Sequence, residues 1–319
     1  MTRPKTIFLS NNDVANTLDM TSAIDALYHM LQDSANGSAF NIPKALGRWG
    51  DGCTMHSLSS AMTQRGYAGI KNWMHTPRGG GSIFSLFDAH NGYLLALIEA
   101  RTLGQLRTGG ITGVATKLMA PRTARRAALI GTGAQAVTQL KAIAAVQALD
   151  AVHVYSPSAE KRRAFVQANN HFPFQLIEAG SLDAALDGAE IVTLITRAKD
   201  PFVHVDQLKE CVHLNAVGAI LPDKAEFTLD VFDRCDLIAV DDIENARRGS
   251  RELREKFGED STQWNVTTLA SLTAGPAYET PPGRMSLFKG MGMGLSDLAL
   301  AIALYEYARE SGLGLTLPN

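Results

Sequence analysis

The sequence has little cysteine, no surplus of charge and no long apolar run. Three cysteines among 319 residues lie far apart without CxxC spacing, which predicts neither a disulfide framework nor a structural zinc cluster and favours a reducing compartment. Thirty basic and thirty-two acidic residues give a formal charge of -2, so nucleic acid and anionic membranes are not expected partners. No apolar run approaches the ~18 residues that span a bilayer, and no apolar signal segment opens the chain, so we expect a cytoplasmic protein.

Local metal-binding patterns are also missing, because the eight histidines include no HxH or HExxH pair, and we predict no metal site. Apolar residues, in contrast, are plentiful. They make up 45% of the chain, and at roughly 150 residues per domain the length predicts about two domains.

From about residue 122 onward, apolar runs alternate with helical stretches. The runs are continuous, which is typical of parallel strands covered on both faces. Candidate strands are 127–131, 151–156, 174–178, 191–196, 212–217 and 237–241. This half is therefore predicted to be α/β, with a parallel sheet of the kind that binds dinucleotides. A polar segment, 245–263, follows the last of these strands.

The first ~120 residues mix strands and helices. Ser10 to Asp13 offers caps for one helix whose apolar positions run from Leu18 to Leu31. Residues 82–87 and 93–98 flank a turn-forming segment and predict a β-hairpin. We assign the closing helix, Ser296 to about Glu310, to this half. The expected domains are therefore 1–120 with 295–319, and 121–294.

The strongest local motif follows the strand at 127–131. Gly131, Gly133, Ala134, Gln135 and Ala136 belong to a GxGxxA sequence that opens an alanine-rich helix. The first glycine permits a tight turn, the second lets the backbone approach a pyrophosphate, and the small Ala136 permits close packing of helix on strand. Any tight turn favours glycine, but a full βαβ pattern follows here. We therefore predict a nicotinamide dinucleotide at this helix N-terminus.

The choice between NAD and NADP depends on the end of the second strand. An acidic residue there would accept hydrogen bonds from the ribose 2′-hydroxyl of NAD, but the sequence has none. Ser156 and Ser158 offer hydrogen bonds to a 2′-phosphate, and Lys161, Arg162 and Arg163 offer positive charge. This pattern favours NADPH. NADH stays possible, because the basic residues also fit the solvated face of the next helix.

Arg107 interrupts an apolar stripe in a predicted helix before the nucleotide domain. A guanidinium there is costly unless an anion meets it, and a substrate carboxylate gripped by two hydrogen bonds is one candidate. A helix-end arginine that extends to solvent, or that pairs with another carboxylate of the chain, explains the pattern equally well.

Lys71 shares one face of a predicted strand with Tyr67, Gly69 and Trp73. Its ammonium group could bind a carboxylate, or donate a proton to an imine nitrogen if its pKa is lowered. Taken alone, the pattern favours the plainer interpretation, a lysine on an edge strand that discourages aggregation.

These motifs, together with the hairpin, occur in an order that resembles the ornithine cyclodeaminase/mu-crystallin family across essentially the whole chain. The segments that carry the resemblance are Gly69–Lys71, Leu106–Gly110, Ile130–Gln135, Asn215–Ala219 and Leu287–Gly292 leading to Ser296 and Asp297.

The resemblance implies a homodimer with a Rossmann NAD(P)-binding domain at 121–294 and a substrate-binding and dimerisation domain formed by 1–120 and 295–319. It implies that Lys71 and Arg107 hold the carboxylate of an imino or amino acid. It also places Thr108 near the cofactor phosphates, and Val217 and Gly218 at the nicotinamide.

Cyclodeaminases of this family resemble one another in an aspartate just after the Val-Gly-Ala segment, but Ile220 stands there in this chain. The resemblance therefore implies a reductase member, which acts on the C=N bond of a small imino acid such as Δ1-pyrroline-2-carboxylate, or an amino-acid or opine-type dehydrogenase. The alternatives are a redox-neutral ornithine cyclodeaminase and a non-catalytic ligand-binding protein like mu-crystallin.

Overall fold

The computed structural model describes residues 4–258 and 263–318. The chain divides into two units, Met1–Thr108 with Met293–Asn319 (unit 1) and Gly109–Gly292 (unit 2). The first boundary lies inside helix α3 (Ala100–Met119), at residue 108, where the sequence-based division placed it at 120. Residues 259–262 of the predicted polar segment lie outside the described residues.

Unit 1 contains a seven-stranded sheet in the order β15-β1-β6-β5-β4-β3-β2. The strands, in this order, are Leu315–Thr316, Ile7–Leu9, Leu94–Glu99, Gly79–Asp88, Tyr67–Thr76, Cys53–Met62 and Ala39–Trp49. The predicted hairpin is confirmed as β5 and β6, which pair antiparallel. Strand β4, which carries Lys71, lies between β3 and β5, so the edge-strand interpretation of Lys71 is wrong.

The helix predicted near the N-terminus is in fact two helices, α1 (Asn11–Thr17) and α2 (Met20–Ala35). Ser10 caps α1, as expected. The chain breaks between the two helices because Asp19 starts a new one: its side chain accepts a hydrogen bond from the backbone N–H of Ser22 and so caps α2. The apolar positions continue across the break, and for that reason the pattern resembled a single helix.

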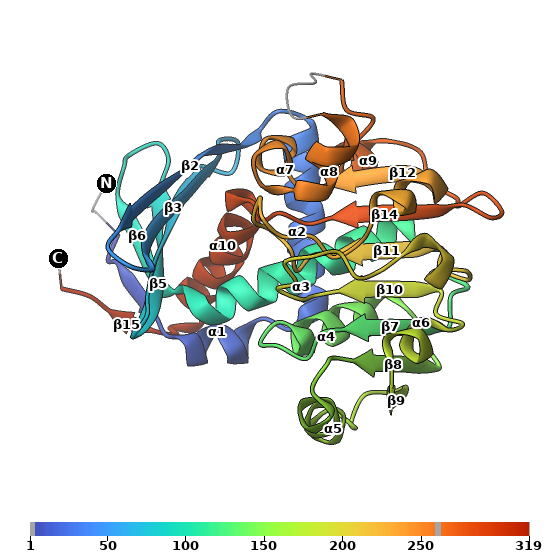
Figure 1. Ribbon diagram of the computed structural model, residues 1–319. Coiled ribbons are helices and arrows are strands. Elements are labelled where there is room, and N and C mark those ends of the chain that lie inside the picture. The colour runs from blue at the N-terminus through green and yellow to red at the C-terminus, as the bar shows by residue number, and fades with distance from the viewer. Residues whose placement is uncertain (1–3, 259–262, 319) are drawn as a thin grey trace. The chain divides into compact units, whose positions relative to one another are not determined.

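The closing helix is confirmed as α10 (Gly294–Ser311), which packs against α2, β3 and β4 within unit 1. It covers one face of the sheet (Figure 1). We call this the inner face. Side chains alternate between the two faces, so Leu58, Lys71 and Phe84, which lie opposite one another on β3, β4 and β5, share the inner face.

Unit 2 contains an eight-stranded parallel sheet in the order β13-β12-β14-β11-β10-β7-β8-β9 (Figure 1). The six predicted strands are confirmed as β7 (Arg126–Ile130), β8 (Ala151–Tyr155), β9 (Gln175–Glu178), β10 (Ile191–Leu194), β11 (His213–Ala216) and β12 (Cys235–Val240). The strand order reverses between β7 and β10, the switch point at which doubly wound sheets bind nucleotides.

Two strands of this sheet were missed, β13 (Thr267–Thr268) and β14 (Met285–Lys289). All five residues of β14 are buried, and the strand lies between β11 and β12. Ser286 and Lys289 interrupt its apolar pattern, and their partners are far away in the sequence. Ser286 donates to the carbonyl of Met119, and Lys289 donates to the carbonyl of Ala219.

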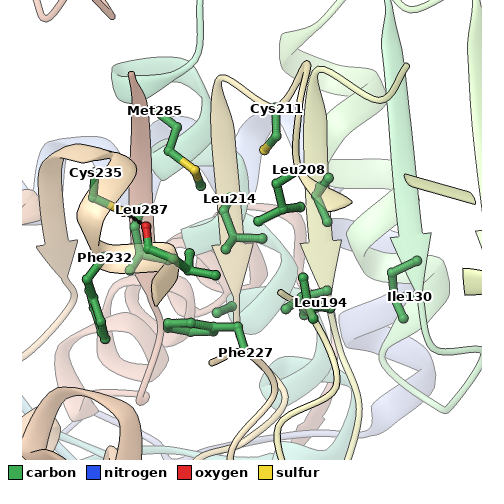
Figure 2. Packing of buried hydrophobic residues seen from close by; sticks show 14 of the residues in the cluster. Ile130, Leu194, Leu208, Cys211, Leu214, Phe227, Phe232, Cys235, Met285 and Leu287 are labelled. Atoms are coloured by element: carbon green, nitrogen blue, oxygen red, sulfur yellow. Dashed lines mark hydrogen bonds between the residues drawn. The ribbon is translucent and has the colours of Figure 1, made fainter. Parts of the chain in front are cut away.

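The sheet of unit 2 has an apolar core on one side, formed by side chains from β7, β10, β11, β14 and the segments that cross over them (Figure 2). Helices of this unit are α4 (Ala136–Val146), α5 (Ala159–Ala168), α6 (Leu182–Leu186), α7 (Ile243–Gly249), α8 (Arg251–Phe257) and α9 (Leu269–Ala274), with 3-10 turns at Val205–Gln207 and Leu229–Arg234. Among the residues that the structure describes, no helix is both long and apolar enough to cross a bilayer.

Candidate active site and nucleotide site

In unit 1, Lys71 and Arg107 lie on either side of one buried carboxylate. Lys71 donates to Asp297 Oδ1 over 2.9 Å, and Arg107 Nε lies 3.5 Å from Asp297 Oδ2. The three residues come from β4, α3 and α10, so segments more than 180 residues apart in the chain meet here. The carboxyl side chain is fully buried, whereas the side chain of Arg107 stays 19% exposed.

Burial and the two neighbouring charges set the protonation of Lys71. Burial lowers its pKa, the carboxylate of Asp297 opposes that fall, and the positive charge of Arg107 adds to it. A lysine that has lost part of its hydration holds its proton less firmly and donates it more readily. Gly104 on α3 leaves room for this ammonium group, because a Cβ at that position would lie 2.7 Å from Lys71 Nζ.

Two hydrogen-bonding atoms of this cluster are buried without a partner. Arg107 Nε and Asp297 Oδ2 make no hydrogen bond, although they face each other as an ion pair. Two positive charges and one negative charge leave the cluster with one net positive charge. The cluster thus has the charge and the donor atoms to hold one small carboxylate.

Sequence reasoning assigned Asp297 no role, although the residue stands in a segment that carried the family resemblance. The signal was a carboxylate in the first turn of an otherwise apolar helix, the arrangement that α10 shows. Acidic residues are common at helix N-termini, where they stabilise the helix. This signal alone therefore did not distinguish a functional role of Asp297 from helix stabilisation.

In unit 2, the loop between β7 and α4 has the features of a phosphate-binding turn. Gly131 has φ 119°, and a Cβ there would lie 2.6 Å from the carbonyl of Ile195, so only glycine fits. A Cβ on Gly133 would meet open space. Gln135 is the N-cap residue of α4 and makes no side-chain capping bond. Glycine at 133 and the first turn of α4 are suited to a pyrophosphate.

The end of β8 lies beside this loop. Thr132 Oγ1 donates to Ser156 Oγ over 3.0 Å. Ser158 caps α5, and Arg162 donates to the carbonyl of Ser156. The guanidinium of Arg162 also lies over the Tyr155 ring, and its Nε lies 3.6 Å from Glu178 without making a hydrogen bond. Arg163 is more exposed.

The carboxyl ends of β10 and β11 are joined by one buried carboxylate, which sequence reasoning missed. Glu226 is fully buried and accepts hydrogen bonds from the backbone N–H groups of Thr196, Gly218 and Ala219 and from the Thr196 hydroxyl. A Cβ on Gly218 would lie 2.2 Å from backbone atoms of Thr196, so the two segments are in close contact. Val217 and Gly218 are therefore held at the end of the sheet where ligands of such folds bind.

A second buried ion pair lies behind this segment. Lys289 donates to Glu252 Oε1 over 3.0 Å, and the same oxygen accepts from the backbone N–H of Glu226. Thr108, which was predicted to lie near the phosphates, is on α3 in unit 1, where its hydroxyl donates to the carbonyl of Gly104. Ile220 is 45% exposed, directly after the segment that Glu226 holds.

Comparisons with known proteins agree with this architecture. The model of the ornithine cyclodeaminase/mu-crystallin family matches residues 4–312. A Delta(1)-pyrroline-2-carboxylate reductase of Bacillus cereus is 30% identical over 236 residues, 73% of this chain and 72% of that protein. An L-lysine cyclodeaminase of Streptomyces rapamycinicus is 31% identical over 72% of this chain and 66% of that protein.

An archaeal alanine dehydrogenase, solved as a dimer with bound NAD, superimposes with a TM-score of 0.89 at 24% identity over 98% of this chain and 99% of that one. A Rossmann domain plus a second α+β domain is the fold that the sequence predicted. On its sequence and its fold, this chain belongs to the ornithine cyclodeaminase/mu-crystallin family.

Proposed function

We propose that this protein is an NAD(P)H-dependent oxidoreductase that reduces the C=N bond of a small imino acid. Unit 1 supplies the substrate site and unit 2 the nucleotide site. The observation that carries the proposal is the cluster of Lys71, Arg107 and Asp297, whose single net positive charge matches one substrate carboxylate. A relative that shares the family and acts on Δ1-pyrroline-2-carboxylate supports the same reaction class.

The chain's own residues have three tasks in this reaction. Arg107 binds the substrate carboxylate through the guanidinium nitrogens that Asp297 leaves unused, and Lys71 adds a second positive charge. A bound reduced nicotinamide supplies a hydride to the imine carbon. The nitrogen takes a proton from Lys71 or water, so the C=N bond becomes CH–NH. Since a protonated imine is already electrophilic, orientation accounts for most of the expected acceleration.

We propose NADPH as the preferred cofactor, with NADH also accepted. No carboxylate stands at the end of β8 to bind a ribose 2′-hydroxyl, and Ser156 offers a hydroxyl there instead. The positive charges of Arg162 and Arg163 lie close by, although both are near Glu178. Replacing Ser156 by Asp should therefore shift the preference toward NADH.

We also propose that the protein is a homodimer in the cytoplasm. The sheet face opposite α10, the outer face, is apolar where the chain leaves it uncovered. Phe40, Ile42, Trp49, Met55 and Met74 are each 44–50% exposed, and the strand register places all five on this face. A large exposed apolar surface of this kind marks an interaction site, and a related alanine dehydrogenase is a dimer.

The deciding experiment follows the absorbance of reduced nicotinamide with purified protein. The panel is Δ1-pyrroline-2-carboxylate, Δ1-piperideine-2-carboxylate, and pyruvate with ammonia or methylamine. Oxidation of NADPH with a cyclic imine supports the reductase, and turnover only with a keto acid and an amine moves the assignment to a dehydrogenase. Ammonia release from ornithine without net oxidation of the cofactor would show a cyclodeaminase, and it would contradict the inference from Ile220 that the protein is a reductase. If neither nicotinamide oxidation nor ammonia release is detected, the result would favour a non-catalytic binding protein.

The same assay tests whether Arg107 binds the substrate carboxylate. Arg107→Ala should lower kcat/KM by about a hundredfold or more, because charge-assisted hydrogen bonds contribute about 1.5–3 kcal/mol each. Arg101→Ala, an exposed arginine on the same helix, is the matched control. Wild-type turnover by Arg107→Ala would remove this residue from the mechanism.

A further inference from the structure

A carboxylate on the neighbouring strand faces the proposed 2′-phosphate site of unit 2. Glu178 is the last residue of β9, and it lies opposite Val154, one residue before the end of β8. Side chains alternate along a strand, so Glu178 points to the same side of the sheet as Leu176, which belongs to one apolar cluster with Phe165 of α5. The carboxylate of Glu178 therefore points toward the side on which α5 packs against β8 and β9.

Two arginines of α5 share this carboxylate. Arg162 Nε lies 3.6 Å from Glu178 Oε1, and Arg163 Nε lies 3.8 Å from Glu178 Oε2. Both distances are too long for a hydrogen bond, and Arg162 Nε is buried without a hydrogen-bond partner. The contact between Glu178 and these two nitrogens is therefore electrostatic.

Contacts other than Glu178 orient the buried arginine. One terminal nitrogen of Arg162 donates to the carbonyl of Ser156 over 2.6 Å, and its Cζ lies 5.3 Å from the centroid of the Tyr155 ring. Ser156 Oγ accepts a hydrogen bond from the Thr132 hydroxyl, and its own hydrogen can be donated to a phosphate oxygen. Removing the charge of Glu178 therefore leaves the guanidinium of Arg162 in place beside Ser156.

The charges near the end of β8 determine how strongly a 2′-phosphate binds. Such a phosphate carries a charge of about −1.5 to −2 at pH 7, and the adenosine ribose of NADH carries none at this position. Arg162 and Arg163 offer two positive charges, and Glu178 offsets one of them. Glu160 and Lys161, which are exposed in the first turn of α5, have opposite charges. One net positive charge therefore faces a phosphate that would be balanced by two.

We propose that Glu178 sets the ratio of the affinities for NADPH and NADH, because it weakens the attraction of Arg162 and Arg163 for the 2′-phosphate. This inference rests on the proposed function and adds a specificity-determining residue to it. In dinucleotide-binding folds the acidic residue that favours NAD stands at the end of the second strand, which is β8 here, and it binds the ribose directly. Glu178 acts from β9 by weakening the binding of NADPH and needs no contact with NADH.

The test measures the dissociation constants of NADPH and NADH by fluorescence titration without substrate. Glu178→Gln keeps the shape of the side chain and removes its charge. We expect NADPH to bind about fivefold more tightly, an effect typical of one charge near a protein surface, and the affinity for NADH to stay unchanged. Glu210→Gln, at an exposed glutamate before the amino end of β11, is the matched control and should change neither constant.

The dependence on salt gives a second readout that a purely structural role would not change. In Glu178→Gln, the affinity for NADPH should fall more steeply with rising ionic strength than in the wild type, because a larger share of the binding is electrostatic. The salt dependence for NADH should be the same in both proteins.

Two results overturn the inference while leaving the nucleotide site intact. Equal changes in the dissociation constants of NADPH and NADH would limit Glu178 to a structural role. Weaker binding of NADPH alone would show that Glu178 holds the arginines in place for the phosphate, the opposite of the proposed effect. A wild-type protein that binds neither nucleotide would count against the proposed function instead.

Discussion

At the scale of single residues, the substrate site that we propose in unit 1 depends on a carboxylate that faces inward. Asp297 is fully buried, yet it does not need to touch substrate to matter, because it holds Lys71 and Arg107 in place and limits their mutual repulsion. We regard it as a positioning residue. Its effect should be visible in the pH dependence of the reaction, which a purely structural role would not change.

Asp297→Asn should therefore shift the pH profile. Without the carboxylate, the pKa of Lys71 loses the influence that opposes its fall, so the lysine becomes neutral at a lower pH and carboxylate binding weakens. We expect KM to rise about tenfold or more near pH 8, and the alkaline limb of kcat/KM to move to lower pH. Ser296→Ala, on the preceding residue, serves as the control. A lower kcat with an unmoved profile would show that Asp297 acts only on folding.

At the scale of elements, buried polar groups fix the strands of unit 2. The imidazole of His213 on β11 lies between Ser286 on β14 and Asn215, and Asn215 donates to Thr116 on α3. This chain of hydrogen bonds sets the register between helix and sheet. Burial lowers the pKa of His213 to about 4, so protonation of this imidazole at low pH opposes the folded state.

The stability of the protein should fall in acid partly for this reason. The native state binds the proton of His213 only near pH 4, whereas the unfolded state binds it near pH 6.5, so stability is retained above about 6.5 and lost as the pH falls toward 4. The slope for one such group is at most about 1.4 kcal/mol per pH unit. Denaturant unfolding at several pH values measures it. His213→Gln should flatten the slope, and His29→Gln, at an exposed position, should not.

The carboxyl ends of β10 and β11 provide a second test at this scale. Glu226→Gln replaces one acceptor oxygen with a donor facing backbone N–H groups, so the segment at Val217 and Gly218 should shift. We expect NADPH to bind about tenfold more weakly, measured by fluorescence titration without substrate. Glu244→Gln, at an exposed glutamate on α7, is the control. Unchanged affinity, with a lower melting temperature only, would limit Glu226 to a structural role.

At the scale of the whole molecule, the outer face of the unit 1 sheet should determine the oligomeric state. Met74→Lys places a charge in the middle of an apolar surface and should convert the dimer to monomers, since burying an unpaired charge in an interface is strongly unfavourable. Light scattering after gel filtration measures the change. Tyr307→Lys, at an exposed aromatic on α10, should leave the mass unchanged. A monomeric wild-type protein would refute the proposed dimer directly.

Much of this architecture could be predicted from the sequence because its signals are local. Continuous apolar runs gave six strands of the parallel sheet, and Gly131 with Gly133 marked the turn before α4. The features that could not be predicted are buried polar residues whose partners lie far away in the sequence. Strand β14 contains Lys289, whose partner Glu252 lies on α8, and Asp297 meets Lys71 from the other end of the chain. A buried charge is recognisable only once its partner is known, and sequence spacing does not reveal partners so far apart.

Unit 1 is assembled from both ends of the chain, which has a consequence for its synthesis on the ribosome. The strand that carries Lys71 is translated more than 200 residues before the helix that packs on it and supplies Asp297. Unit 2 is one continuous segment, and all of its strands are translated before that helix. We expect nascent chains to hold a folded nucleotide domain beside an uncovered sheet, a state in which chaperone binding is most useful.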